Sequence, residues 1–186
     1  ITSTSPAVME LNSDPGSSAT DNVTNDNVMN VSAVESNATF EFSLDSGGTW
    51  SDGTGSSFTL TEDTTFPAGS VQIRKTDIAD NLSSVTNNAS IIKIVSTKPA
   101  APTLTLNSDT GIDAADFITT DAVMNVGGIV VGGRFQFSLN GGAWTDGNGT
   151  SFSLASDAVY NATSIKVRQI DIAENISNTT SSANTI

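Results

Sequence analysis

The sequence predicts an all-β protein made of two tandem copies of one domain, and three observations support this prediction. Motifs from the first half of the chain recur in the same order in the second half. Apolar and polar residues alternate in short segments, as they do in strands that are buried on one face. Short stretches rich in Gly, Asn, Asp and Ser separate these segments, and no stretch has a convincing helical period.

The internal repeat covers nearly the whole chain. The motif LNSD at residues 11–14 recurs at residues 106–109, and VMNV at residues 28–31 recurs at residues 123–126. Four further motifs follow in the same order: FxFS at 40–43 and 135–138, WxDG at 50–53 and 144–147, GxSFxL at 55–60 and 149–154, and RxxDIA at 74–79 and 168–173. Self-similarity of this kind is the signature of a repeat architecture, so both halves are expected to share one fold.

The boundary between the two copies lies in a proline-containing seam. We place the domains at residues 1–97 and 98–186, because the motifs of the second copy begin after this point. The seam, residues 96–102, contains Pro99 and Pro102. Two prolines in so short a stretch favour a stiff, extended connection.

Each copy contains several short predicted strands. Apolar residues alternate with polar ones at Met9 and Leu11, Met29 and Val31, Phe40, Phe42 and Leu44, Phe58 and Leu60, and Val71 and Ile73. Ser43 is expected to face outward from its strand, as are Gln72 and Arg74. The apolar run at residues 91–95 also has the composition of a strand. Several short strands at this spacing predict a sandwich or a barrel.

Trp50 and Trp144 occupy equivalent positions in the two copies. Each could form a stacking platform for a sugar or fill the core beside the Phe-rich strand. Aromatic side chains contribute strongly to core packing, and the residue recurs at one structural position. We therefore expect both Trp side chains to lie in the core.

The charge and composition of the chain exclude several functions. Seven basic residues against twenty acidic ones give a net charge of −13, with no basic cluster that could bind nucleic acid or an anionic membrane surface. No apolar run approaches the roughly 20 residues of a membrane-spanning helix, so no direct membrane insertion is expected. The chain has neither His nor Cys, which removes the commonest general base and thiolate metal sites.

The acidic residues recur in two kinds of loop. The long segment between the first two predicted strands contains Asp14, Asp21 and Asp26 in the first copy and Asp109, Asp116 and Asp121 in the second. A second acidic loop lies at residues 77–81 and again at residues 171–175. Carboxylate and amide oxygens are the ligands that Ca²⁺ prefers, although no EF-hand spacing is present. The alternative is that Asp and Asn recur because they favour turns.

The order of the strands suggests how these loops could cooperate. With strands running alternately, the two acidic loops of one domain lie at opposite ends. End-to-end stacking of two domains would then bring Asp14 and Asp21 near Asp171 and Glu174. A cation there would neutralise repelling carboxylates and hold the domains in line, whereas its loss would leave a mobile joint.

Taken together, the motifs resemble those of a known family. LNSD(P/T)G, FxFSL(D/N), the Gly-Gly turn followed by Trp, GxGxSFxL and RxxDIA(D/E)N are similar to the bacterial immunoglobulin-like repeats of giant RTX-type and biofilm-associated surface adhesins. The resemblance implies two tandem immunoglobulin-like β-sandwich domains with structural Ca²⁺ at or near their junctions. Carried over to this sequence, it points to six metal ligands: Asp14, Asp21, Asp77, Asp109, Asp116 and Asp171.

The resemblance also implies a function and a location. Such repeats are spacers strung between a membrane anchor and ligand-binding domains at the bacterial cell surface, so the expected partners are adjacent repeats of the same chain and the expected state is a monomer. The seam departs from the family, because residues 96–98 (Ser-Thr-Lys) lack the Asp that often helps to bind the ion. Sites confined to the acidic loops are less affected by this departure.

Two other functions are weighed against a calcium-stiffened spacer. A module that binds carbohydrate, ice or a host surface would need exposed aromatic residues or a flat Thr-rich face. An enzyme, for example a glycosidase with two carboxylates, fits worst, because duplicated Asp residues in turns do not suggest one catalytic cleft. The sequence therefore predicts a structural extender and no enzymatic activity.

Overall fold

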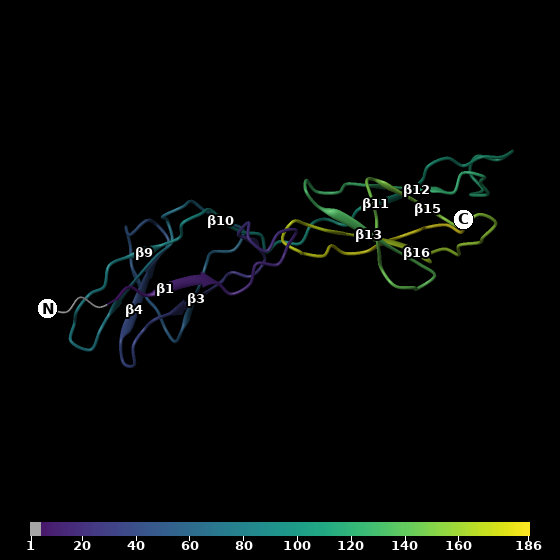
Figure 1. Ribbon diagram of the computed structural model, residues 1–186. Helices are drawn as coiled ribbons and strands as arrows, with labels where there is room; N and C mark the ends of the chain where they lie inside the picture. Colours follow the sequence, from purple (N-terminus) through teal and green to yellow (C-terminus); the bar gives the residue numbers. More distant parts are fainter. Residues whose placement is uncertain (1–4) are drawn as a thin grey trace. The chain divides into compact units, whose positions relative to one another are not determined.

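The computed structural model describes residues 5–186 and divides into two compact units, the first ending at Thr97 and the second beginning at Lys98 (Figure 1). The described residues form strands, turns and bends, which confirms the all-β prediction. Since no helix occurs among them, the described chain has no helix of the length and apolarity needed to cross a membrane.

The first unit is built from short strands in three sheets. Its strands are β1 (Val8–Leu11), β2 (Val23–Thr24), β3 (Val28–Ser32), β4 (Thr39–Ser43), β5 (Ser51–Asp52), β6 (Ser57–Thr59), β7 (Thr65–Phe66), β8 (Gln72–Thr76), β9 (Thr86–Asn87) and β10 (Ile92–Ile94). The strand orders are β1-β3-β6, β5-β4-β8-β9 and β2-β10-β7. All pairs are antiparallel except β2 with β10, which is parallel.

The second unit repeats two of these three sheets. Its strands are β11 (Thr103–Leu106), β12 (Val123–Gly127), β13 (Arg134–Leu139), β14 (Thr145–Asp146), β15 (Ser151–Ser153), β16 (Ile165–Ile170) and β17 (Thr180–Ser181). The strand orders are β11-β12-β15 and β14-β13-β16-β17. These orders match β1-β3-β6 and β5-β4-β8-β9 strand for strand.

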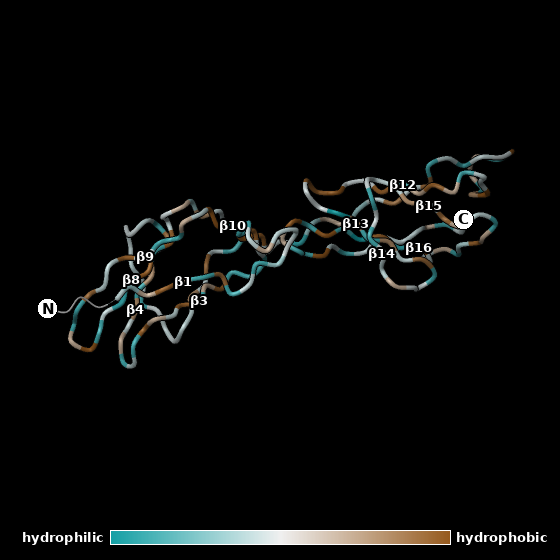
Figure 2. The backbone as a smooth tube through the Cα atoms, in the orientation of Figure 1, coloured by the Kyte–Doolittle hydropathy of each residue, from teal (hydrophilic) through white to brown (hydrophobic). Residues whose placement is uncertain are grey.

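The core of each unit joins residues from the two sheets that both units share, as in a β-sandwich. In the first unit, Met29 on β3 packs in one buried cluster with Phe40 on β4 and Ile73 on β8. In the second unit, Met124 on β12 packs with Phe135 on β13 in the same way. Buried and half-buried residues alternate along β3, β8 and β12, because successive side chains point to opposite faces of a sheet. Figure 2 colours the same segments by hydropathy.

One strand departs from the predicted alternation. Ser43 was expected to face outward from β4, but its side chain is buried. The hydroxyl donates to Asp45 Oδ1 at 2.7 Å and accepts from Gly47 N at 2.9 Å. Ser43 is buried because it organises the following turn, so its burial is satisfied by local hydrogen bonds.

Neither Trp side chain lies in the core, so that prediction is wrong. Trp50 and Trp144 are half-buried, and an arginine guanidinium stacks on each ring. The distances from the guanidinium carbon to the ring centroid are 4.0 Å for Arg74 on Trp50 and 4.2 Å for Arg168 on Trp144. The arginines lie on the outer faces of β8 and β16, and cation–π attraction holds the rings there.

The seam is hydrogen-bonded to both units. The carboxylate of Asp63 accepts from Ser96 N at 2.8 Å and from Thr97 N at 3.0 Å, within the first unit. Gln169 Nε2 donates to Ala100 O at 2.6 Å within the second unit. The connecting segment is therefore ordered up to Thr97 on one side and from Ala100 on the other.

Candidate functional site

The predicted metal ligands of each unit lie at opposite ends of its sheets. Leu11 pairs with Met29, so the loop that contains Asp14 and Asp21 lies where β1 ends and β3 begins. Thr76 pairs with Thr39, so the loop after β8 lies at the end where β4 begins. The strand order therefore places the loop of Asp77 away from the first acidic loop, and no site within one unit combines the two loops.

The first acidic loop, residues 12–27, contains a carboxylate that is only half satisfied. Asp14 Oδ2 accepts from Asn22 N at 3.1 Å. Its other oxygen, Oδ1, is buried and has no hydrogen-bond partner. A buried carboxylate oxygen without a donor is costly, because it has lost water without gaining a replacement. Such an atom indicates that a group outside the chain satisfies it.

The second unit repeats this arrangement in the equivalent loop, residues 107–122. Asp109 Oδ2 accepts from Phe117 N at 2.9 Å, and Asp109 Oδ1 is again buried without a partner. Asn22 and Phe117 both have positive φ, 58° and 62°. The same unusual backbone and the same unsatisfied oxygen therefore occur twice, although the residue that donates differs.

Asp21 and Asp116 are exposed residues of the same two loops. Asp21 Oδ1 accepts from Val23 N at 3.0 Å, and Asp116 Oδ1 accepts from Ile118 N at 2.9 Å. Each Asp therefore holds a turn beside the amide that Asp14 or Asp109 accepts, and its second oxygen, Oδ2, is available as a further ligand.

The remaining polar residues of the loop hold its ends together. Asp26 accepts from Val28 N at 3.0 Å and from Asn12 Nδ2 at 2.7 Å. Thr24 Oγ1 donates to Ser13 O at 2.9 Å. The second unit repeats these bonds with Asp121, Val123, Asn107, Thr119 and Ser108. Sequence reasoning grouped Asp26 with the other acids, but its two oxygens bridge β1 and β3 and so form structural bonds.

Asp77 closes the turn that follows β8. Its Oδ1 accepts from Ala79 N at 2.8 Å and from Asn81 N at 2.9 Å, and its Oδ2 accepts from Asn81 Nδ2 at 2.9 Å. The Asn81 side-chain hydrogen bond is the largest cause that lowers the pKa of Asp77. These bonds account for the recurrence of this Asp as a turn residue, the alternative recognised from the sequence.

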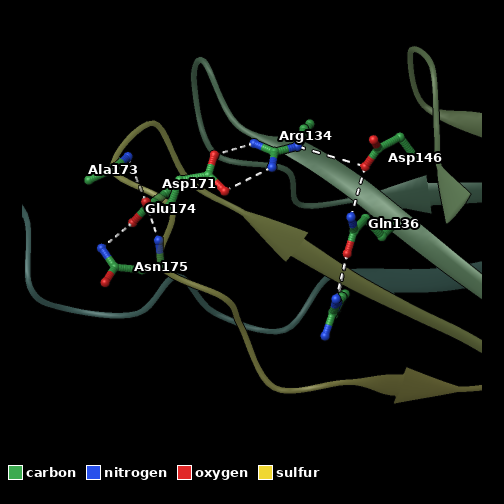
Figure 3. A network of polar contacts seen from close by, with 8 residues as sticks. Arg134, Gln136, Asp146, Asp171, Ala173, Glu174 and Asn175 are labelled. Atoms are coloured by element: carbon green, nitrogen blue, oxygen red, sulfur yellow. Dashed lines mark hydrogen bonds and ion pairs between the residues drawn. The ribbon is translucent and has the colours of Figure 1, made fainter. Parts of the chain in front are cut away.

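Asp171 closes the equivalent turn in the second unit, and Figure 3 shows it facing Ala173 and Asn175. Asp171 is 6% exposed, and both of its oxygens accept N–H groups at 2.9 Å. Metal binding by Asp77 and Asp171 stays a prediction. The oxygens of both residues already accept hydrogen bonds within their own turns.

Glu174, in the same turn, forms an ion pair with the strand beside it. Arg134 Nη1 and Nη2 donate to the two Glu174 oxygens at 2.7 and 2.9 Å, as Figure 3 shows. The guanidinium lowers the pKa of Glu174, and the carboxylate raises the pKa of Arg134. The first unit has Thr39 and Asp80 at these positions, so this ion pair is specific to the second unit.

The donor set of the first acidic loop fits a calcium ion, which the family resemblance implies. Among residues 5–186, no three acidic, His or Cys side chains lie close enough together to hold a metal. An ion bound here would be held by Asp14 Oδ1, the buried oxygen that lacks a donor, with Asp21 as a second carboxylate of the same loop. Ca²⁺ prefers such oxygen ligands, and Asp109 and Asp116 offer the same pair in the second unit.

Comparison with known proteins leaves the family open. No protein-family model and no curated protein matches the sequence. Among solved structures, the chain is similar to one from "Cytokine receptor complex - Crystal form 2", at 12% sequence identity and a TM-score of 0.36. The match covers 86% of this chain and 97% of the other. At this TM-score the similarity supports no conclusion about function.

Proposed function

We propose that the chain is a pair of tandem immunoglobulin-like β-sandwich repeats that serves as a structural spacer in a large bacterial surface adhesin. Each repeat binds a structural calcium ion in its first acidic loop. The role is mechanical and non-enzymatic, supporting cell adhesion and biofilm formation outside the cell. The partners of each repeat are its neighbours in the same chain, and the chain is a monomer.

The observation that supports calcium binding most directly is the pair of unsatisfied oxygens, Asp14 Oδ1 and Asp109 Oδ1. They lie at equivalent positions in the two loops, each beside a second oxygen that accepts a backbone amide of the same loop. A bound cation would satisfy both atoms and balance part of the net charge of −13.

The spacer role is supported by the seam as well as by the repeat. Asp63 binds the seam as far as Thr97, and Gln169 binds it from Ala100 onward. The spacer role requires that equivalent domains follow one another directly along the chain, and the first unit ends at Thr97 where the second begins at Lys98. A junction site formed by Asp14 and Asp21 of one repeat with Asp171 and Glu174 of the other stays a prediction.

Calcium dependence of stability is the first test. A ligand that binds only the folded state stabilises it by about 2.7 kcal/mol at 100 times its dissociation constant. For units of this size we expect the unfolding midpoint to be about 10 °C or more higher in calcium at that concentration than in EDTA. Differential scanning calorimetry measures this shift, and small-angle scattering under both conditions tests whether the ion also limits motion between the units.

Matched variants assign the effect to the loops. The double variant Asp14→Asn/Asp109→Asn should lose the calcium-dependent shift, and without calcium it should be as stable as the wild type because it removes two unsatisfied charges. Asp45→Asn removes an acidic side chain outside both loops and should keep the full shift. Equal midpoints in calcium and EDTA for the wild type would contradict the proposed calcium site.

A binding module for carbohydrate or another surface is the alternative function. The half-buried Trp50 and Trp144 rings favour it, because they are accessible at equivalent outer positions. A glycan array compared between the wild type and Trp50→Ala/Trp144→Ala separates the two functions. Binding that disappears in the variant would favour the alternative over a spacer.

A further inference from the structure

Asn88 in the first unit and Ser182 in the second are equivalent residues with different side chains. Each follows the last strand of a four-stranded sheet, β9 or β17, and each is buried, at 7% and 6% exposure. Asn88 N donates to Val71 O at 3.0 Å. Ser182 N donates to the equivalent oxygen, Ile165 O, at 2.8 Å. The backbone is therefore the same in both units, and only the side chain differs.

The Asn88 side chain binds three backbone groups in the first unit. Its Oδ1 accepts from Val71 N at 2.9 Å, and its Nδ2 donates to Pro67 O at 2.9 Å and to Ser90 O at 2.7 Å. The hydroxyl of Ser70 also donates to Pro67 O, at 2.7 Å. Every polar atom of these two buried side chains therefore has a partner, as is usual for buried polar groups.

The second unit lacks these side-chain hydrogen bonds. The oxygens Ser164 Oγ and Ser182 Oγ are both buried, and neither has a hydrogen-bond partner. Ser164 is the equivalent of Ser70, and the carbonyl that Ser70 binds in the first unit corresponds to Asn161 O. Neither hydroxyl therefore donates to Asn161 O, and Ser182 Oγ does not accept from Ile165 N. Two buried hydroxyls in one place have thus lost water without gaining a protein partner.

The two hydroxyls lie around one carbonyl group. In the first unit, Asn88 Nδ2 and Ser70 Oγ both donate to Pro67 O, so these atoms are close to one another. The turn has the same backbone bond in both units. Ser70 N donates to Pro67 O at 3.1 Å, and Ser164 N donates to Asn161 O at 3.0 Å. One small molecule beside this carbonyl would therefore reach both hydroxyls of the second unit.

Size and access fit a water molecule. Asn88 has a carboxamide where Ser182 has a single hydroxyl, so Ser182 fills less of the same space. Ser182 also lines a cavity of about 420 Å³, and Asn88 lines the equivalent cavity of about 340 Å³ in the first unit. Because the cavity occurs in both units, it is a feature of the fold and gives water a path to this position. A buried water requires two to four polar partners, and this position offers that number.

We infer that the second unit binds one buried water molecule beside Ser182, in the place of the Asn88 carboxamide. The water accepts from Ile165 N and donates to Asn161 O. It also forms hydrogen bonds with the hydroxyls of Ser164 and Ser182, each of which then has a partner. Such a water is part of the fold and is costly to remove. This inference is independent of calcium binding and of the spacer role.

A high-resolution crystal structure of the whole chain tests the inference directly. We expect one water peak at a hydrogen-bonding distance of about 2.7–3.2 Å from Ser182 Oγ and from Asn161 O. In Ser182→Asn, the new carboxamide should displace this water and form the bonds that Asn88 forms in the first unit. The reciprocal variant Asn88→Ser should gain a water in the first unit. A wild-type structure without this water would overturn the inference.

The stability of the second unit provides a second test, because the sign of the effect depends on the water. In a Trp50→Phe background, Trp144 fluorescence follows the second unit alone. We expect Ser182→Ala to lower its thermal midpoint by about 4 °C, since the water loses a partner. A hydroxyl without any partner predicts the opposite, because its removal also removes a desolvation cost.

Ser156→Ala is the matched control for the serine substitution. Ser156 is an exposed residue of the same unit, so its replacement should change the midpoint little. A midpoint that rises or stays unchanged in Ser182→Ala would contradict the bound water. A fall in Ser182→Ala that Ser156→Ala does not share would support it.

Discussion

The two units place different residues in one buried polar position. Lys75 in the first unit and Gln169 in the second are equivalent, and both are fully buried. Lys75 Nζ donates to Ala33 O at 2.6 Å and to Glu35 Oε1 at 2.7 Å. A charged amine in the first unit and a neutral amide in the second therefore bind the equivalent loop, which follows β3 in the first unit and β12 in the second.

Gln169 satisfies the same loop through different hydrogen bonds. Its Nε2 donates to Gly128 O at 3.0 Å and to Ala100 O at 2.6 Å, and its Oε1 accepts from Val130 N at 2.8 Å. The comparison teaches that the position requires a long polar side chain whose donors reach backbone carbonyls, and that a positive charge is optional. Burial is possible in both cases because every polar contact replaces water.

Removing these side chains should have the largest effect among substitutions that compare the units. We expect Gln169→Leu to cost about 3 kcal/mol or more of unfolding free energy, because several buried backbone groups lose their partners. Lys75→Leu should cost about 2 kcal/mol, since Glu35 is half exposed and can recover water. Urea unfolding followed by the single Trp of each unit, with the other Trp replaced by Phe, measures both values.

The reciprocal substitutions Lys75→Gln and Gln169→Lys sharpen the same comparison. If the position requires only a long polar donor, each should cost less than its Leu counterpart. Leu variants as stable as the wild type would show that these hydrogen bonds contribute little.

A glycine shared by both units should give the next effect. A Cβ on Gly53 would lie 2.0 Å from the ring of Phe40, and one on Gly147 would lie 2.0 Å from the ring of Phe135. We expect Gly53→Ala and Gly147→Ala each to cost about 1–3 kcal/mol through overpacking, with similar values in the two units. The same urea measurements report these costs.

Gly55→Ala is the matched control for steric contact. Gly55 has a φ of +69° and no heavy atom within 4 Å of an added Cβ, so only backbone strain of about 1 kcal/mol is expected. A smaller cost at Gly53 than at Gly55 would contradict the close packing of Gly53 on the Phe40 ring.

The smallest expected difference between the units is the loss of folding stability at acidic pH. Hydrogen bonds from Thr49 N, the Ser43 hydroxyl and the Thr49 hydroxyl lower the pKa of Asp45 to about 2, and the pKa of Asp63 is also lowered, chiefly by the Thr97 hydroxyl. A depressed folded-state pKa contributes stability above the unfolded value of about 3.8, and this stability is lost as pH falls toward the folded value. The first unit should therefore lose stability between about pH 4 and pH 2.

The second unit has Asn140 where the first has Asp45, so it lacks this contribution, and its own acid sensitivity comes from the lowered pKa of Glu174 beside Arg134. Asp45→Asn should reduce the acid sensitivity of the first unit, measured as the fall in its thermal midpoint from pH 5 to pH 2. An unchanged pH dependence in this variant would show that Asp45 does not contribute.

Much of the fold could be predicted because period-two alternation is a local property. The strands around Met29, Phe40 and Ile73 all form, and the run at residues 91–95 contains β10. The acidic segments also form loops, and the Asp residues of the first loop accept equivalent backbone hydrogen bonds in both copies. The prediction for Trp50 and Trp144 is wrong because the arginine that stacks on each ring comes from another strand of the same sheet, β8 or β16, which the local pattern does not reveal.

The sequence by itself determined the duplication, the all-β class and the recurrence of carboxylates in loops, since each follows from the order of residue types along the chain. Only the tertiary structure decided which carboxylates have a free oxygen. In Asp77 and Asp171 both carboxylate oxygens accept hydrogen bonds within their own turns. Asp14 and Asp109 each have one buried oxygen without a donor. That distinction depends on which N–H groups reach each oxygen after packing, and spacing along the chain does not specify it.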